Sequence, residues 1–290
     1  MYYFLLIKND KVNIMCAYLL LNQFSINTNL SENLQGVFDS HCHINSVNQE
    51  TEQLIQSCMD AGMSGLISVC ASPADLNSTI SLSKKYLGFI YYTAGLHPLE
   101  AIKLDDSSFE NYLKEIDSAI NSNSPPLAIG EIGLDYVLIH QDEEVKRAIA
   151  QERFIDLIKI SKKFTLPIVI HCRNAYRDVI DILSQNGCRK VVFHYFNDVG
   201  FTKEIIDKGW SVSLPITISK NKAKEIISTS GDLDNIMLET DSPIQLQERK
   251  ITPLNLGELI QKISDGTGIK KEEIIEKTTK NVCSFFAIRL

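Results

Sequence analysis

Several features that mark special classes of protein are scarce in this chain of 290 residues. The 7 cysteines are an odd, scattered set without a C-x-x-C pair, which argues against a disulfide framework and favours a reducing compartment. No run reaches the roughly 18 apolar residues that a membrane span requires. With 29 basic against 36 acidic residues, the formal net charge of -7 excludes a generally basic coat for nucleic acid. We therefore expect a cytoplasmic globular protein in which a phosphate ligand needs a local positive centre.

The N-terminal segment, residues 1–35, does not share the pattern of the rest. Residues 1–7 and 14–21 are apolar, but the polar stretch 8–11 separates them and no basic segment precedes the first run, so a signal peptide is disfavoured. An additional packed element and an upstream start codon, with Met15 as the first residue, both stay open. We treat residues 1–35 as an N-terminal extension of unclear status. Residues 36–290 contain no Gly/Ser-rich or Pro-rich linker, which predicts one domain.

Residues 36–290 alternate between short runs rich in β-branched residues and longer segments with helical periodicity, such as 143–163. Repeated βα units imply parallel strands, and eight such units are the number that closes a barrel. The pattern therefore predicts an α/β fold of the (β/α)8 TIM-barrel class, with an open doubly wound sheet as its rival. The expected strands are residues 37–41, 66–70, 90–94, 127–131, 167–171, 190–194, 210–214 and 235–239.

The 6 histidines are distributed unevenly along this pattern. Only His140 lies away from the end of an expected strand. Barrel active sites form at the carboxyl ends of the strands, so the clustering predicts a site there. The histidines at strand ends are His41, His43, His97, His171 and His194.

The segment from Asp39 to His43 places histidines two residues apart. Alternate side chains of a strand share a face, so Asp39, His41 and His43 are expected to point one way while Ser40 and Cys42 point the other. Two imidazoles on one face can bind the same metal ion. The alternative is a pair of polar histidines that merely ends the strand.

Acidic residues end two further strands. Glu131 closes an apolar run and Asp241 follows the eighth, and a carboxylate is costly to bury unless it is paired or binds metal. A salt bridge is the alternative at each position. Together with the histidines, these carboxylates form a ring of nitrogen and oxygen donors that suits divalent metals. The predicted ligands are His41, His43, Glu131, His171, His194 and Asp241.

This donor set predicts two divalent cations, Mg²⁺, Mn²⁺ or Zn²⁺, with Glu131 between them. Two dications and two carboxylates leave a charge of about +2, which attracts phosphate although the protein is acidic. Bound cations also lower the pKa of water towards 7, and Asp241 could take its proton as a general base.

Five ordered motifs give the chain from about Gly36 onward a family resemblance. It resembles the TatD family of metal-dependent hydrolases, within the amidohydrolase-type barrel superfamily. The matching segments are residues 38–43, 95–98, 128–136, 166–175 and 238–243, in the family's order.

The resemblance implies that the six residues are metal ligands, that Glu131 bridges the metals, and that the activity is metal-dependent hydrolysis. The family includes magnesium-dependent deoxyribonucleases, some of which are 3′–5′ exonucleases on single strands. We therefore expect the substrate to be DNA or another phosphate-containing molecule, bound as a single strand or at a strand end. We expect no obligate protein partner. An ester, amide or lactone hydrolase of the same superfamily is the alternative, and an inactive binding barrel is the third. Two segments depart from the family pattern, 195–198 and 249–253, and both lie in loops expected to select substrate.

Two further residues are weaker candidates for substrate binding. His97 could contact a phosphate or leaving group, or merely stabilise its loop. Arg173, two residues beyond His171, could bind a phosphate with two hydrogen bonds, or pair with a nearby carboxylate.

Overall fold

Eight short apolar segments form parallel strands, each followed by helical structure. In the computed structural model, residues 34–45, 48–139 and 143–289 are described. All eight predicted strands are present within two residues of their expected starts, although β4 continues four residues further than expected. The strands are β1 (Phe38–Cys42), β2 (Gly65–Val69), β3 (Ile90–Thr93), β4 (Ile129–Asp135), β5 (Ile168–Arg173), β6 (Val191–Phe193), β7 (Ser211–Pro215) and β8 (Ile236–Glu239).

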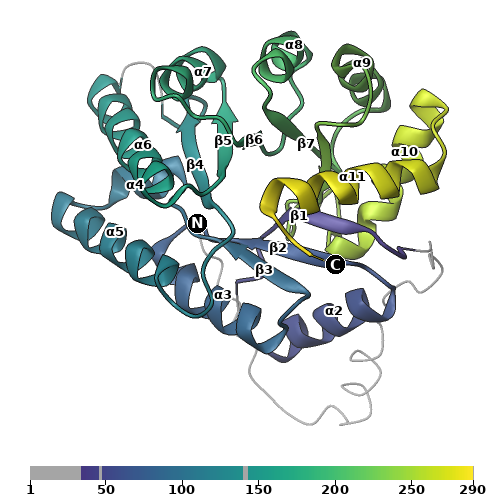
Figure 1. Ribbon diagram of the computed structural model, residues 1–290, viewed down its shortest axis with the longest axis horizontal. Coiled ribbons are helices and arrows are strands. Elements are labelled where there is room, and N and C mark those ends of the chain that lie inside the picture. The colour runs from purple at the N-terminus through teal and green to yellow at the C-terminus, as the bar shows by residue number, and fades with distance from the viewer. Residues whose placement is uncertain (1–33, 46–47, 140–142, 290) are drawn as a thin grey trace, which may run out of the picture. The chain divides into compact units, whose positions relative to one another are not determined.

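The helices surround the strands on the outside, as Figure 1 shows. Local signals start several of them: Asn48, Asp105 and Ser219 each accept a hydrogen bond from a backbone N–H of the first turn. The helices are α2 (Gln49–Asp60), α3 (Pro73–Lys85), α4 (Pro98–Lys103), α5 (Asp106–Ile120), α6 (Glu144–Phe164), α7 (Tyr176–Gln185), α8 (Val199–Asp207), α9 (Lys220–Ser230), α10 (Leu256–Thr267) and α11 (Lys271–Phe286), with a 3-10 turn at Pro253–Asn255. None of the described helices is long and apolar enough to cross a membrane.

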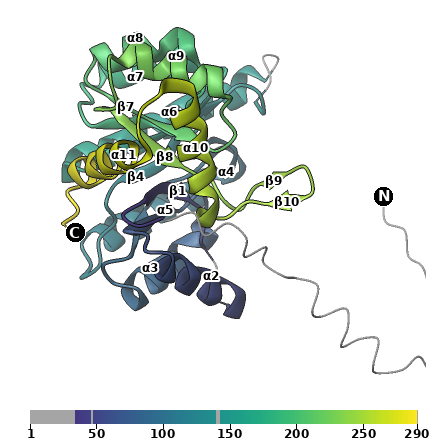
Figure 2. The ribbon, with the colours of Figure 1, turned by 90° about the vertical axis from the view of Figure 1, so that its right-hand side faces the viewer.

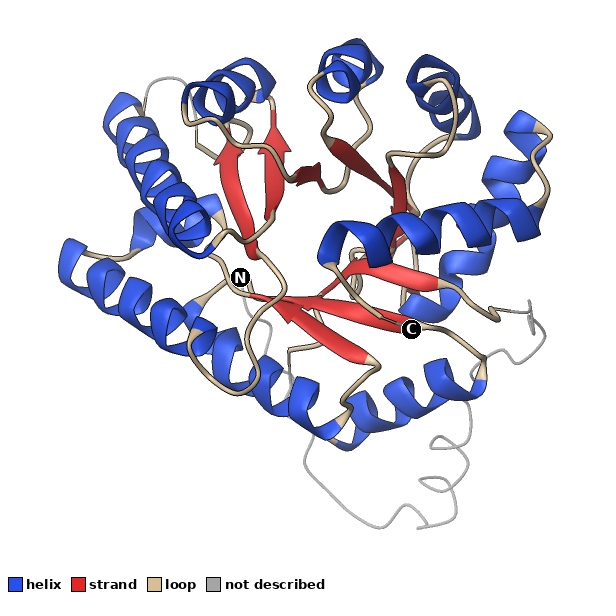
Figure 3. Ribbon diagram, viewed as in Figure 1, coloured by secondary structure: helices blue, strands red, loops and turns tan. Residues whose placement is uncertain are grey.

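The strands pair in two parallel sheets, β1-β2-β3 and β4-β5-β6-β7-β8. Ala94, just after β3, joins the sheets: its N–H donates to Ala128 O at 3.1 Å and its carbonyl accepts from Gly130 N at 3.0 Å. On the other side, Asp241 N donates to His41 O at 2.9 Å and so connects the end of β8 to β1. The strands therefore form the predicted TIM barrel, with the helices outside (Figure 3).

The barrel interior is apolar at the amino ends of the strands. There the side chains from the strands pack against the last turns of α11 and the residues after it, which cover this end of the barrel. The cluster comprises Phe38, Ile67, Val69, Ala128, Val169, Val192, Met237, Val282, Phe285, Phe286 and Ile288.

A short hairpin that the sequence pattern did not predict follows β8. Its strands are β9 (Gln245–Leu246) and β10 (Arg249–Lys250), and Figure 2 shows it extending from the barrel. The predicted extension, residues 1–35, lies outside the described residues except for its last two positions, as does His140. The predicted domain division therefore stays a prediction.

Candidate metal centre

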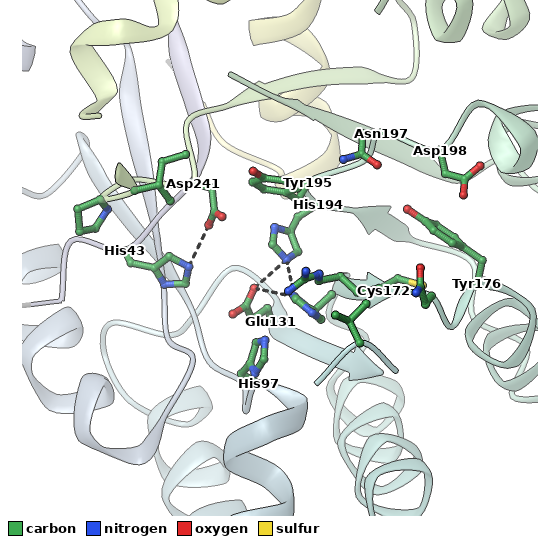
Figure 4. Close-up of a pocket in the computed structure, with 16 residues that line it drawn as sticks. His43, His97, Glu131, Cys172, Tyr176, His194, Tyr195, Asn197, Asp198 and Asp241 are labelled. Carbon is green, nitrogen blue, oxygen red and sulfur yellow. Dashed lines mark hydrogen bonds and ion pairs between the residues drawn. The ribbon is translucent and has the colours of Figure 1, made fainter. Parts of the chain in front are cut away.

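The structure brings the six predicted ligands together at the carboxyl ends of the strands. His41 and His43 come from the end of β1, Glu131 from β4, His171 from β5 and His194 from the residue after β6. Asp241 lies two residues beyond β8. Figure 4 shows His43, Glu131, His194 and Asp241 directed towards the same space. Five strands thus supply one cluster.

Glu131 occupies the middle of this cluster. Its Oε2 atom lies 2.8 Å from His194 Nε2, 3.4 Å from His41 Nε2 and 4.0 Å from His171 Nδ1. The side chain is 4% exposed. Despite these short distances, Oε2 has no partner with hydrogen-bond geometry among the described residues. A cation bound among these atoms would contact the buried carboxylate oxygen and the imidazole nitrogens together.

Asp241 faces the two histidines of β1. Its Oδ1 atom lies 3.2 Å from His43 Nε2 and 3.6 Å from His41 Nε2. The residue adopts a left-handed backbone conformation, with φ of 54°, which aspartate tolerates better than most residues. Its side chain is 19% exposed and lines the cavity, so it can reach both the cluster and a substrate.

Hydrogen bonds to outer acceptors orient two rings of the cluster, those of His43 and His171, and a longer ion-pair contact lies behind a third, that of His194. His43 Nδ1 lies 3.1 Å from Val69 O, so Nε2 is left for the cluster. His194 Nδ1 lies 3.5 Å from Glu239 Oε1, and its Nε2 faces inward. His171 is reversed: Nε2 lies 3.1 Å from Asp135 Oδ2, and Nδ1 faces inward. For His43 and His171, these acceptors favour a proton on the outer nitrogen and a lone pair directed into the cluster.

Neighbouring charges and burial shift the pKa values of several residues in the cluster. Burial disfavours the charged form of both partners, but the His194 imidazole holds the pKa of Glu131 well below its ordinary value. Glu131 in turn raises the pKa of His194 well above its ordinary value despite burial. Burial and the neighbouring His194 lower the pKa of His41. A cation satisfies several imidazoles and the carboxylates at once, which one proton cannot do.

The donor set fits divalent metals. In each of three groups, one ligand atom per residue lies within 4.8 Å of the others: His41, His43 and Glu131; Glu131, His171 and His194; His41, His194 and Asp241. Mixed imidazole and carboxylate donors are the ligands of zinc and related dications. The residues present therefore fit a metal centre.

The prediction that Asp39 points the same way as His41 and His43 is wrong. The pairing register shifts between Asp39 and Cys42, so strict alternation does not hold through β1. Asp39 is fully buried, but its carboxylate accepts hydrogen bonds from Thr240 Oγ1 at 2.6 Å and from the backbone N–H groups of Thr240 and His41 at 3.2 Å. Asp39 thus joins β1 to β8 and does not face the metal ligands.

The two weaker candidates line a cavity of about 860 Å³ beside the cluster. The His97 ring lies edge-on to that of His171, with centroids 4.3 Å apart, and its Nδ1 accepts a hydrogen bond from Leu99 N at 3.2 Å. Burial and the neighbouring His171 lower the pKa of His97 to about 4, which favours a neutral ring. Arg173 is half-exposed, 3.7 Å from Asp135 Oδ2, so its predicted alternative, an ion pair with a carboxylate, is present.

Asp135 is the residue that sequence reasoning missed. It is fully buried beside His171, and its other oxygen accepts hydrogen bonds from Val137 N and Leu138 N, each at 2.9 Å. The expected strand ended at Glu131, whereas β4 continues to Asp135. The spacing Glu131, Gly133, Asp135 is itself a period-2 signal that a longer strand would have revealed.

Comparisons with known proteins show which family this chain resembles over most of its length. The family described as TatD related DNase matches residues 38–287. A human protein named deoxyribonuclease TATDN3 is 28% identical over 87% of this chain and 94% of its own length. A Methanocaldococcus jannaschii protein named an uncharacterized metal-dependent hydrolase is 31% identical over 87% of this chain and 97% of its own.

The fold comparison adds a solved structure, a TatD homologue from Escherichia coli. It aligns with a TM-score of 0.76 at 21% identity, over 88% of this chain and all of the other. At that identity the likeness shows the fold, and the family match rests on the sequence. The chain belongs to the TatD-related deoxyribonuclease family.

Proposed function

We propose that this protein is a divalent-metal-dependent deoxyribonuclease that hydrolyses phosphodiester bonds at the carboxyl end of its barrel. The observation that carries the proposal is the buried Glu131 Oε2, which lies among inward-facing imidazole nitrogens without a hydrogen bond from the described residues. Family membership and the names of the relatives support hydrolysis and DNA as its substrate.

Two cations, Mg²⁺, Mn²⁺ or Zn²⁺, would be held by separate halves of the cluster. His41, His43 and Asp241 would bind one of them. His171 and His194 would bind the other, and Glu131 would contact both. The support is that the ligand atoms of His41, His43 and Glu131, and those of Glu131, His171 and His194, form two groups that share Glu131.

The cavity fits a single strand or a chain end better than continuous duplex. Its volume of about 860 Å³ is within the range of small-molecule pockets, roughly 300–1,000 Å³. A terminal nucleotide can enter such a space, which supports exonuclease action, and the 3′–5′ direction follows from the family resemblance. We also propose that the protein works in the cytoplasm without an obligate protein partner.

The chain's own residues have distinct tasks in this reaction. Bound dications supply Lewis acidity and a lowered pKa of water. Asp241, which is partly exposed to the cavity, takes the proton of the attacking water as general base. Arg173 donates hydrogen bonds to a phosphate of the substrate. Since His97 Nδ1 accepts from Leu99 N, the neutral ring carries its proton on Nε2 and can donate it in a hydrogen bond to the phosphate or leaving group.

A parallel assay of three substrates tests this function. Protein reconstituted with Mg²⁺, Mn²⁺ or Zn²⁺ is incubated with 3′- or 5′-labelled single-stranded DNA, a phosphodiester analogue and a p-nitrophenyl ester. We expect DNA to be shortened from its 3′ end, EDTA to stop the reaction, and readded metal to restore it. Intact DNA together with a cleaved ester would refute the nuclease proposal in favour of the ester hydrolase.

Metal analysis tests the ligand assignments independently of the substrate. His171→Ala and Glu131→Ala are expected to lower the bound metal per folded chain, whereas Asp207→Asn, in an exposed pair with Lys203, should leave it unchanged. Wild-type metal content in both ligand variants would contradict the assignment.

A further inference from the structure

The carboxylate of Asp135 contacts one predicted metal ligand and one arginine that lines the substrate cavity. Its Oδ2 atom lies 3.1 Å from His171 Nε2 and 3.7 Å from an Arg173 Nη atom. His171 is a predicted ligand, and Arg173 lines the cavity. Asp135 itself does not belong to the Glu131-centred group, because it contacts the nitrogen of His171 that faces away from Glu131.

We propose that Asp135 is a positioning residue that keeps the His171 proton on Nε2 and so presents the Nδ1 lone pair to the metal centre. The proposal rests on His171 being a metal ligand, as assigned under the proposed function. The orientation of Asp135 is determined from its other side, because Oδ1 accepts hydrogen bonds from Val137 N and Leu138 N, each at 2.9 Å. Oδ2 is thereby directed at His171 and Arg173.

His171 presents the opposite ring nitrogen to the cluster from its neighbours. His43 and His194 direct Nε2 inward, whereas His171 directs Nδ1 inward. His171 Nδ1 lies 3.2 Å from His194 Nε2 and 4.0 Å from Glu131 Oε2. With its proton on Nδ1, the ring would point a hydrogen into the cluster and could not bind a cation there.

The substitution Asp135→Asn should reverse the tautomer. The two backbone N–H groups require an acceptor at the Oδ1 position, so the amide oxygen takes that place and the NH₂ group takes the place of Oδ2. An NH₂ group there donates to His171 Nε2, which must then be the acceptor, and the proton moves to Nδ1. A nearly isosteric change would thus convert an outer hydrogen-bond acceptor into a donor. Asp207→Asn is the matched control, since that carboxylate is exposed and pairs only with Lys203 among the described residues.

The test is ¹⁵N NMR of the imidazoles, combined with titration of Zn²⁺. In wild-type protein without metal, we expect the neutral His171 ring to carry its proton on Nε2 and to leave Nδ1 unprotonated. Asp135→Asn should show the reverse and bind Zn²⁺ about 10- to 100-fold more weakly, the usual range for an outer partner of a metal ligand. Asp207→Asn should match wild type in both measurements. Asp135→Ala, which removes the acceptor without adding a donor, should lie between wild type and Asp135→Asn in Zn²⁺ affinity.

Each outcome decides one point. A wild-type His171 protonated on Nδ1 would overturn the proposal even if no variant folds. Unchanged Zn²⁺ affinity in a folded Asp135→Asn would also overturn it. If His171→Ala retains full metal content, the ligand assignment under the proposed function fails instead, and the two failures are distinguishable.

Discussion

The two ends of the barrel are built from the same strands but have opposite chemistry. At the amino ends, Val169, Val192 and Met237 belong to the apolar cluster closed by α11. Two residues after each of these, towards the carboxyl end of the strand, lie His171, His194 and Glu239. Alternate residues share a face, so a step of two moves along the same inner wall from packing to chemistry. One end of these strands therefore supplies stability and the other end supplies function.

The largest expected effect falls on the chemical end. Asp241→Asn removes the proposed general base, and we expect kcat on single-stranded DNA to fall about 100- to 10,000-fold, the range for acid–base groups. The melting temperature should fall only slightly, because the replacement is nearly isosteric, although the charge facing His43 Nε2 at 3.2 Å is lost. A steady-state assay with calorimetry measures both. Activity within threefold of wild type would show that a group other than Asp241 acts as the general base.

The apolar end should show the reverse behaviour. Phe286 is 4% exposed in the α11 cluster. Truncation by Phe286→Ala should lower the free energy of unfolding by about 3–5 kcal/mol, since a cavity replaces a buried ring. Metal content and kcat per folded molecule should stay at the wild-type level below the melting transition. A proportional loss of kcat would show that the two ends are coupled.

Gly133 tests the connection between strand packing and ligand position. It has φ of 144°, and a Cβ built there would lie 2.0 Å from His171 O. We expect Gly133→Ala to cost about 1–3 kcal/mol from overpacking and backbone strain. Because the clash displaces the backbone of a proposed ligand, metal content should also fall, as measured by mass spectrometry of the dialysed protein. Full metal content with reduced stability would limit the effect to packing.

The smallest effect is expected from a substitution in the β9–β10 hairpin, which belongs to neither end of the barrel. Arg249 forms two hydrogen bonds to Glu258, at 2.8 and 2.7 Å, but its side chain is half-exposed. An exposed ion pair contributes little, so Arg249→Ala should change the free energy of unfolding by less than about 1 kcal/mol. Urea denaturation measures this change. A loss above 2 kcal/mol would mean that the hairpin supports the barrel.

The fold was predictable because its signals are local and repeated. Eight apolar runs, with histidines at the ends of several, predict parallel strands and the functional end of a barrel from sequence alone. The prediction failed where local rules were overridden. Asp39 was expected beside His41, but the register shift in β1 directs it to Thr240. Asp135 was overlooked because β4 extends beyond its apolar run.

The amino-acid sequence by itself determined the alternation of strands and helices, the residue types at the strand ends and the motifs of the family. Those features depend on side-chain period and on the chemistry of single residues. Only the tertiary structure decided which imidazole nitrogen faces the cluster, and that Glu131 lies among four histidines without a hydrogen bond from the described part of the chain. Those properties depend on atoms from residues as far apart in the sequence as His41 and Asp241, whose distances are set by closure of the barrel.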